Sequence, residues 1–214
     1  MGQDKMLAII DYDMGNLRSV AKAFELLDTK VLITYNQKEI SEASHLVLPG
    51  VGAFADGMAN LKKYGLIDFL ADQVLVKKKP ILGICLGLQL MAKQSEEFGI
   101  HQGLGWLDAQ VKAFDLKNYD LKVPHVGWNN IELVGHCPIF LGIKQNSAFY
   151  FVHSYHFVPN NLEIVSAKCN YGIDFVAAVW QKNIFATQFH PEKSQFLGLK
   201  ILKNFLGVKG EKNG

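Results

Sequence analysis

The first half of the chain alternates short apolar runs with stretches in which apolar residues recur every three or four positions. Such runs are typical of buried strands, and such spacing is typical of helices with one buried face. The runs predict strands at 7–12, 30–35, 45–49 and 80–84, and the spacing predicts helices at 17–27 and 54–76, the second broken near 64–65. This alternation predicts β-α-β units around a parallel sheet.

From about residue 110 to residue 187 the pattern changes to strand-like segments separated by turn residues. They lie at 109–114, 129–134, 147–152, 162–168 and 174–180. We expect them to form an added antiparallel region. A buried strand at 183–189 and a helix at 194–207 follow. The predicted fold class is α/β, a mostly parallel central sheet flanked by helices with antiparallel strands added, in a single domain over residues 1–214.

Composition and charge narrow the class of protein. The chain has 214 residues, 49% of them hydrophobic and 20% charged, which suffices for one sizeable core. Its 22 basic and 20 acidic residues give a formal charge of +2, so we do not expect binding to nucleic acid or to anionic membranes. The apolar run at 80–92 is shorter than the roughly 20 residues that span a bilayer, and no signal-peptide pattern opens the chain. We expect a soluble, cytoplasmic protein.

The cysteines and histidines give little indication of metal binding. Cys85, Cys137 and Cys169 are widely spaced and form no C-x-x-C pair, which argues against a disulfide framework and a zinc site. His153 and His156 lie close together in the sequence, but no cysteine or carboxylate cluster accompanies them. We therefore expect no metal and no cofactor, and a reducing compartment.

Cys85 lies between Gly83 and Gly87, where a predicted strand meets a helix-like run. The pattern G-x-C-x-G is the cysteine counterpart of the serine nucleophile elbow, in which small neighbours allow a sharp strand-to-helix turn. At a helix N-terminus the free N–H groups and the helix dipole favour an anion, which raises the reactive thiolate fraction. The alternative is a small buried side chain in a close-packed junction.

A nucleophile of this kind needs a general base, and the base needs an acceptor that orients it. The stretch "ATQFHPEKSQ" ends a predicted buried strand with His190, and Glu192 follows two residues later, within reach of the ring. Cys85, His190 and Glu192 would then serve as nucleophile, general base and acid, and orienting carboxylate. Taken alone, the position of His190 favours an ordinary surface or core histidine.

A tetrahedral intermediate also requires donors for its oxyanion. The glycine-rich turn "PGVGAF" supplies backbone N–H groups at the end of a predicted strand. The N–H groups of Gly52 and Leu86 are the candidate donors. A glycine-rich turn is often only a tight turn, but three separate parts that complete one mechanism are unlikely to coincide by chance.

Together these motifs resemble those of the class I, or triad, glutamine amidotransferases. "GICLGLQLM" and "HPEKS" are the general signature, and "DYDMGNLRSV", "LPGVGAF", "VPHVGWN" and "FYFVHSY" are similar to the branch of the family that serves histidine biosynthesis. The stretches run from Asp11 to Ser194. The sequence departs from the pattern at Asp13, where the family has glycine, so we expect a local difference in that loop.

The resemblance implies that L-glutamine is hydrolysed through a γ-glutamyl thioester on Cys85. It implies a separate (β/α)8 barrel cyclase or synthase subunit as partner in a heterodimer, which uses the ammonia to make imidazole glycerol phosphate and AICAR. It also implies that glutamine is held by Gly50, Gln89, Ser154 and Tyr155.

By the same resemblance, Asn16, Trp128, Tyr150 and Lys193 surround the partner interface and the mouth of the ammonia path. Trp128 in a turn context suits an interface anchor, and the alternative is a core tryptophan.

Three other functions stay open at this point. A paralogue could deliver ammonia to another amidation, such as that of a surface sugar. A non-catalytic subunit could support a partner allosterically, although the intact Cys85, His190 and Glu192 argue against it. A cysteine hydrolase or peptidase of related fold would leave "VPHVGWN" and "HPEKS" unexplained.

Overall fold

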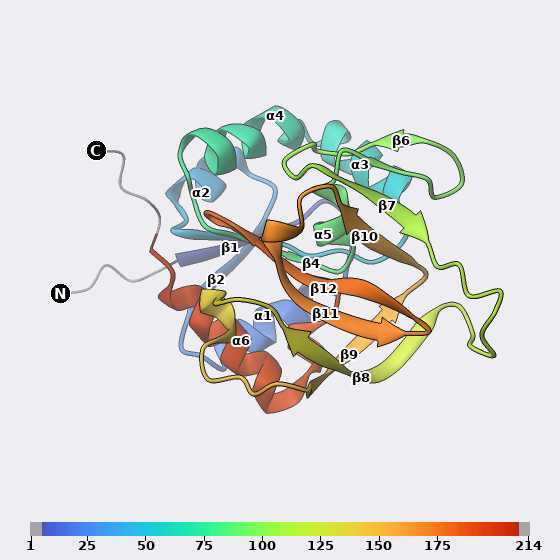
Figure 1. The fold of residues 1–214 in the computed structure, drawn as a ribbon. Helices are drawn as coiled ribbons and strands as arrows, with labels where there is room; N and C mark the ends of the chain where they lie inside the picture. The colour runs from blue at the N-terminus through green and yellow to red at the C-terminus, as the bar shows by residue number, and fades with distance from the viewer. Residues whose placement is uncertain (1–5, 210–214) are drawn as a thin grey trace.

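Two sheets and the surrounding helices make up the fold, which a computed structural model describes for residues 6–209 (Figure 1). The strands are β1 (Met6–Ile10), β2 (Lys30–Thr34), β3 (His45–Leu48), β4 (Ile81–Ile84), β5 (Gln94–Ser95), β6 (His101–Gln102), β7 (Ala109–Ala113), β8 (His125–Leu133), β9 (Ser147–His153), β10 (Tyr155–Pro159), β11 (Val165–Tyr171), β12 (Ile173–Gln181) and β13 (Ile184–Thr187). The α-helices are α1 (Leu17–Glu25), α2 (Gln37–Glu42), α3 (Phe54–Lys63), α4 (Leu66–Ala71), α5 (Leu86–Leu90) and α6 (Gln195–Gly207). A π-helical turn, η1 (Asp72–Val76), follows α4, and the 3-10 turns are η2 (Pro138–Phe140), η3 (Leu162–Ile164) and η4 (Pro191–Lys193).

The larger sheet has nine strands in the order β2-β1-β3-β4-β13-β12-β11-β8-β9. The strands from β2 to β13 pair in parallel. The strands from β13 to β9 pair antiparallel, so β13 joins the two halves. The predicted parallel sheet and its antiparallel extension are both present.

The smaller sheet has the order β10-β7-β5-β6. The predicted segment 109–114 belongs here, because β7 pairs antiparallel with β10 and parallel with β5 instead of joining the larger sheet. The sequence pattern did not indicate β5, β6 or β10. β5 and β6 have two residues each, which is too short for any periodicity, and β10 is separated from β9 by Ser154 alone.

Helices cover both faces of the parallel half. In Figure 1, α1 and α6 lie on one face, whereas α2, α3 and α4 lie on the other. Alternate residues of β1 reach opposite cores: Leu7 and Ile9 belong to the α1/α6 side, and Ala8 and Ile10 to the other. Burial on both faces explains why these strands read as continuous apolar runs.

One predicted boundary is confirmed, and others differ from the sequence expectation. The predicted break near residues 64–65 is confirmed, since Gly65 takes the left-handed conformation (φ +63°) between α3 and α4. The segment 162–168 begins with the η3 turn, and β11 starts at Val165. β8 starts at His125, four residues before the predicted segment, where the buried position is a histidine and the exposed positions are the apolar Val126 and Trp128, so no buried apolar pattern marks the start. Within residues 6–209, no helix has both the length and the apolar character needed to cross a membrane.

Candidate active site

The neighbouring parallel strands β4 and β13 bring two distant segments to one edge of the sheet. Ile84 pairs with Thr187, the last residue of β13. Immediately beyond, the backbone N–H of Cys85 donates to the Thr187 carbonyl at 2.8 Å. Because the carboxyl ends of parallel strands meet at the same edge, Cys85 and the segment leading to His190 lie together.

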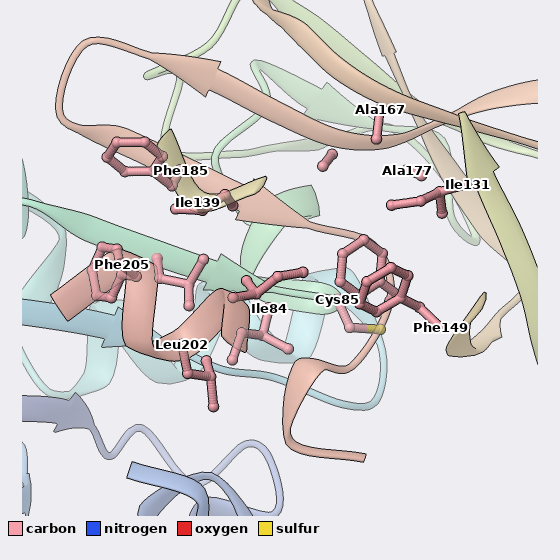
Figure 2. Close-up of a cluster of buried hydrophobic side chains, with 14 of the residues drawn as sticks. Ile84, Cys85, Ile131, Ile139, Phe149, Ala167, Ala177, Phe185, Leu202 and Phe205 are labelled. Carbon is pink, nitrogen blue, oxygen red and sulfur yellow. The ribbon is translucent and has the colours of Figure 1, made fainter. Parts of the chain in front are cut away.

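The backbone at Cys85 forms the expected sharp elbow. Cys85 has φ +54° and ψ −106°, a conformation that residues other than glycine rarely adopt and that is often found at functional sites. A Cβ atom at Gly87 would overlap the Leu48 carbonyl oxygen, and one at Gly83 would lie 2.9 Å from Met91 Cε. Gly87 is therefore required by close packing, and Gly83 is favoured because its Cβ would also lie 3.0 Å from the backbone of Gly87 and Leu88. Figure 2 shows Cys85 beyond Ile84, at the margin of the buried cluster on the α1/α6 side.

His190 and Glu192 form a buried pair. Nδ1 of His190 lies 2.8 Å from Oε1 of Glu192, and the two side chains are 2% and 3% exposed. Since Nδ1 bonds to a carboxylate, it carries the proton, and Nε2, which is buried without a hydrogen-bond partner, is free to accept one. Burial alone would lower the pKa of His190, but the Cys85 side chain, once ionised to the thiolate, and the Glu192 carboxylate outweigh it and raise that pKa above its ordinary value. His190 is therefore no surface histidine.

The backbone around His190 is anchored to β9 through Tyr150 and Ser194. The His190 N–H donates to the Tyr150 carbonyl at 2.9 Å. The Ser194 hydroxyl donates to the His190 carbonyl at 2.6 Å and accepts from the Tyr150 N–H at 3.0 Å. These bonds fix the 3-10 turn η4 that positions Glu192.

A cavity of about 390 Å³ opens at Cys85. Its lining residues are Val51, Gly52, Cys85, Leu86, Gln89, Glu97, Pro124, Val152, His153, Ser154, Tyr155 and Lys193. Of the residues expected to bind glutamine, Gln89, Ser154 and Tyr155 line this cavity, and Gly50 does not. His190 and Glu192 do not line the cavity, and both side chains are almost fully buried.

The candidate oxyanion donors lie on the cavity wall. Gly52 has φ +104°, which favours glycine at that position. The Leu86 N–H donates to the Gly50 carbonyl at 3.4 Å, a long bond that leaves this donor weakly engaged. A Cβ atom at Gly50 would overlap the Tyr12 hydroxyl, which itself donates to the Pro49 carbonyl at 2.6 Å. The buried Tyr12 side chain thus packs against the turn at residues 49–52 and fixes its position.

Two polar residues of the site were not predicted from the sequence. Gln188 is fully buried, and its Nε2 lies 3.6 Å from Cys85 Sγ. It lies within the segment predicted as a buried strand, but only the register between β4 and β13 places it beside Cys85. Glu97 lies in the loop between β5 and β6, and it is the single carboxylate of the lining among the residues that the structure describes. No pattern in the sequence indicates it.

His153 takes part in a hydrogen-bonded pair with His125. Nδ1 of His153 lies 2.8 Å from the Tyr155 carbonyl, which only accepts, so Nδ1 carries the proton. Nε2 of His153 then accepts from Nδ1–H of His125 at 3.0 Å. Burial lowers the pKa of His125 to about 4 and that of His153 to about 3, so both rings are neutral near pH 7. In the described part of the chain, no three His, Cys, Asp or Glu side chains are grouped to hold a metal ion.

Three of the four expected interface residues lie together on the surface. The Trp128 ring is 6.2 Å from that of Tyr150, and Lys193 Nζ lies 5.8 Å above the Tyr150 ring. Trp128 is 49% exposed, so it is not a core residue. We call these three residues the Trp128 cluster. Asn16 caps α1 by accepting from the Ser19 N–H at 3.3 Å.

Asp13, which replaces the expected glycine, has φ +61°. Aspartate tolerates this left-handed conformation better than most residues do. Its carboxylate accepts from the Tyr64 hydroxyl at 2.6 Å and from Lys63 Nζ at 3.2 Å. The departure is therefore accommodated locally, by a new polar contact to the end of α3.

Comparison with known proteins agrees with this geometry. The profile of the family described as glutamine amidotransferase class-I matches residues 8–208. "Imidazole glycerol phosphate synthase subunit HisH 1" of Campylobacter jejuni (strain RM1221) is 52% identical over 201 residues, covering 94% of this chain and 99% of that protein. The subunit HisH of Syntrophotalea carbinolica is 50% identical over 204 residues, covering 94% and 98%.

Solved structures share the fold at low identity. The structure of PurLQS from Thermotoga maritima matches with a TM-score of 0.73 at 15% identity, covering 96% of this chain and 99% of that one. The glutaminase domain of Trypanosoma brucei CTPS with bound acivicin matches with a TM-score of 0.64 at 19% identity, covering 97% of each chain. The predicted fold class is confirmed. The chain belongs to the class I glutamine amidotransferase family, within its HisH branch.

Proposed function

We propose that the chain hydrolyses glutamine at Cys85 and passes the ammonia to a separate (β/α)8 barrel subunit, which makes imidazole glycerol phosphate and AICAR. The observation that carries the chemistry is the buried His190–Glu192 pair, whose imidazole interacts with Cys85, together with a strained Cys85 that lines a cavity. The match over residues 8–208 supports a single domain. A biosynthetic role supports a cytoplasmic location.

The reaction begins with transfer of the Cys85 thiol proton to Nε2 of His190. The thiolate attacks the γ-carbonyl carbon of glutamine, and the oxyanion of the tetrahedral intermediate accepts from the N–H groups of Gly52 and Leu86. The imidazolium returns its proton to the leaving nitrogen, and ammonia departs from the thioester. Water then attacks the thioester with His190 as base, and the carbon–sulfur bond breaks to give glutamate and thiolate.

Glu192 keeps the imidazole in the reactive tautomer. The carboxylate accepts a hydrogen bond from Nδ1–H, so Nε2 is left to take the thiol proton. The carboxylate also stabilises the imidazolium that forms. The pair is almost fully buried, so these charges are weakly screened by solvent.

The cavity contains groups of the kinds that an amino acid zwitterion requires. Glu97 supplies a carboxylate for the α-ammonium group, with Gln89 beside it. Ser154 and Tyr155 at the β9–β10 corner suit the α-carboxylate, and Val51 and Gly52 of the glycine-rich turn complete the lining. An apolar ligand would leave these polar groups unpaired.

The Trp128 cluster supports the proposed partner. It presents an exposed tryptophan, a half-buried tyrosine and a cation, a composition enriched in protein interfaces. Lys193 belongs to the cluster and also lines the cavity, so a subunit docked there would sit beside the reacting centre. The relatives named above are called subunits of imidazole glycerol phosphate synthase. A different acceptor of ammonia is the alternative, and the assay below distinguishes the two.

The test is a glutaminase assay with and without the barrel subunit and its nucleotide substrate. We expect low turnover by the chain alone and stimulation by both additions. The Cys85→Ala protein should lose hydrolysis and still bind the partner. Cys137→Ala alters an equally buried cysteine outside the site, and this variant should retain hydrolysis. Hydrolysis by pure Cys85→Ala protein would refute the assignment. Stimulation by the partner without the histidine-pathway nucleotide would favour a different acceptor.

A further inference from the structure

Gln188 lies beside the reactive sulfur because of the register between β4 and β13. Its backbone N–H donates to the Ala177 carbonyl at 2.8 Å, and its side chain is fully buried. Thr187, one residue earlier, accepts the Cys85 N–H. The Gln188 side chain is thereby directed to Cys85 Sγ, with Nε2 at 3.6 Å.

The hydrogen bonds around Gln188 determine which end of its amide faces the sulfur. The Tyr155 carbonyl only accepts, so the Gln89 atom at 3.0 Å from it must be the donor Nε2. The second hydrogen of the same Nε2 points to the Gln188 side chain at 3.2 Å, which must therefore present its oxygen there. The remaining end of Gln188, its NH2 group, is left facing Cys85.

An amide N–H beside sulfur favours the thiolate over the thiol. A neutral thiol is a weak acceptor, whereas a thiolate accepts a charge-assisted hydrogen bond. On the other side of the sulfur, the Val152 carbonyl lies 3.8 Å away and can only accept, so it favours the protonated thiol. When the thiol proton moves to His190, the Gln188 N–H therefore stabilises the thiolate and offsets the unfavourable effect of the Val152 carbonyl on it.

We infer that Gln188 is a further catalytic residue, which donates to the Cys85 thiolate and at the same time fixes Gln89 for substrate binding. This inference rests on the proposed glutaminase function. The bond to sulfur is lost when the thioester forms, because the acylated sulfur is neutral. It forms again when water attacks the acyl carbon and the thiolate leaves, so Gln188 assists both formation of the nucleophile and hydrolysis of the thioester.

The direct test is the pH dependence of Cys85 alkylation by iodoacetamide in the full chain, followed by mass spectrometry of the peptide that contains Cys85. Gln188→Met keeps the length of the side chain and removes the donor. We expect its alkylation midpoint to rise by about one pH unit, equivalent to roughly tenfold less thiolate below the midpoint. The midpoint pH of the acid limb of the kcat/KM profile for glutamine should rise by the same amount. KM should increase because Gln89 loses its hydrogen-bond acceptor.

Thr187→Val is the matched control, because Thr187 is equally buried and adjacent but directs its hydroxyl to the Phe189 carbonyl. Its midpoint should equal that of the unsubstituted protein. If Gln188→Met does not melt cooperatively, Gln188→Asn decides, since its amide is one methylene short of the sulfur and should produce the same upward shift. A folded variant whose midpoint moves by less than about 0.3 pH unit overturns the role of Gln188. If unsubstituted protein with its partner hydrolyses no glutamine, the proposed function itself fails instead.

Discussion

Replacing His156 by phenylalanine should make the folded protein less sensitive to acid. The His156 ring stacks on Phe114, with centroids 4.9 Å apart and an interplanar angle of 22°. Its Nδ1 is buried without a hydrogen-bond partner. Burial, together with the charge of Lys112, lowers the pKa of His156 to about 4, against an opposing effect of Glu96. An aromatic ring without nitrogen retains the stack and removes the titrating group.

The sign and size of the effect follow from the two pKa values. In the unfolded chain His156 titrates near its ordinary pKa of 6.5, whereas in the folded protein its pKa is about 4. Below pH 6.5 the unfolded state therefore binds a proton that the folded state excludes, and stability falls as the pH decreases towards 4. At pH 5 the difference spans 1.5 units, which corresponds to about 2 kcal/mol.

Other histidines also contribute to the pH dependence of the free energy of unfolding, so the unsubstituted protein must be measured beside the variant. His125 and His153, with pKa values lowered to about 4 and about 3, contribute with the same sign as His156. His190 has a raised pKa, so its contribution is fully present below pH 6.5, is lost as the pH rises through the raised value, and adds no slope between pH 6.5 and 5. The difference between His156→Phe and the unsubstituted protein therefore reports His156 itself, together with its smaller electrostatic effect on the pKa of His153.

The assay is urea unfolding followed by far-UV circular dichroism at pH 7 and pH 5. Between these two pH values, His156→Phe should lose about 2 kcal/mol less stability than the unsubstituted protein. His136→Gln, which changes an exposed histidine, should behave like the unsubstituted protein. Equal acid sensitivity in all three proteins would refute the reasoning.

Three further changes test the elbow, the core and the surface. Gly87→Ala forces a methyl group onto the Leu48 carbonyl, so urea unfolding should show a loss of at least about 2 kcal/mol, and a loss below about 0.5 kcal/mol would contradict the packing argument. Asn183→Ala removes Nδ2, which donates to two backbone carbonyls at 2.8 Å and 2.9 Å, so the same measurement should show a loss of about 2–3 kcal/mol, and a loss below about 0.5 kcal/mol would contradict the role of these bonds. Trp128→Ala should weaken association with the barrel subunit at least about tenfold in a calorimetric titration and leave the melting temperature of the isolated chain unchanged, and unaltered affinity would remove Trp128 from the interface.

The sequence predicted the parallel half of the fold well because all of its strands except the edge strand β2 are buried on both faces. Runs such as residues 45–48 and 81–84 are entirely buried, so apolar character alone indicates them. The smaller sheet was missed because its pairing is non-local: β5 and β6 have too few residues for a pattern, and β7 meets β10 across more than forty positions of the chain. Propensity along the chain carries no information about such partners.

The residues of the candidate site also fall into two groups, those marked by a local sequence pattern and those placed by non-local contacts. Cys85, His190 and Glu192 could be found because each occupies a position with a local signature, a strand end followed by a glycine-bounded or proline-stiffened turn. Gln188 and Glu97 have no such signature. Gln188 acquires its role from register, since the pairing of Thr187 with Ile84 places it opposite Cys85, and Glu97 acquires its position from a loop that folds over the cavity.

The elbow and the core support each other at the end of β4. Cys85 adopts a costly backbone conformation, and three contacts hold it there: its N–H donates to Thr187 at 2.8 Å, its carbonyl accepts from Gln89 N–H at 3.3 Å, and Gly87 packs closely against Leu48. These contacts depend on the packing of β3, β4 and β13 against one another. The strain is therefore stored in the sheet that also fixes His190, so a change that loosens the β4–β13 end relaxes the nucleophile before it unfolds the domain.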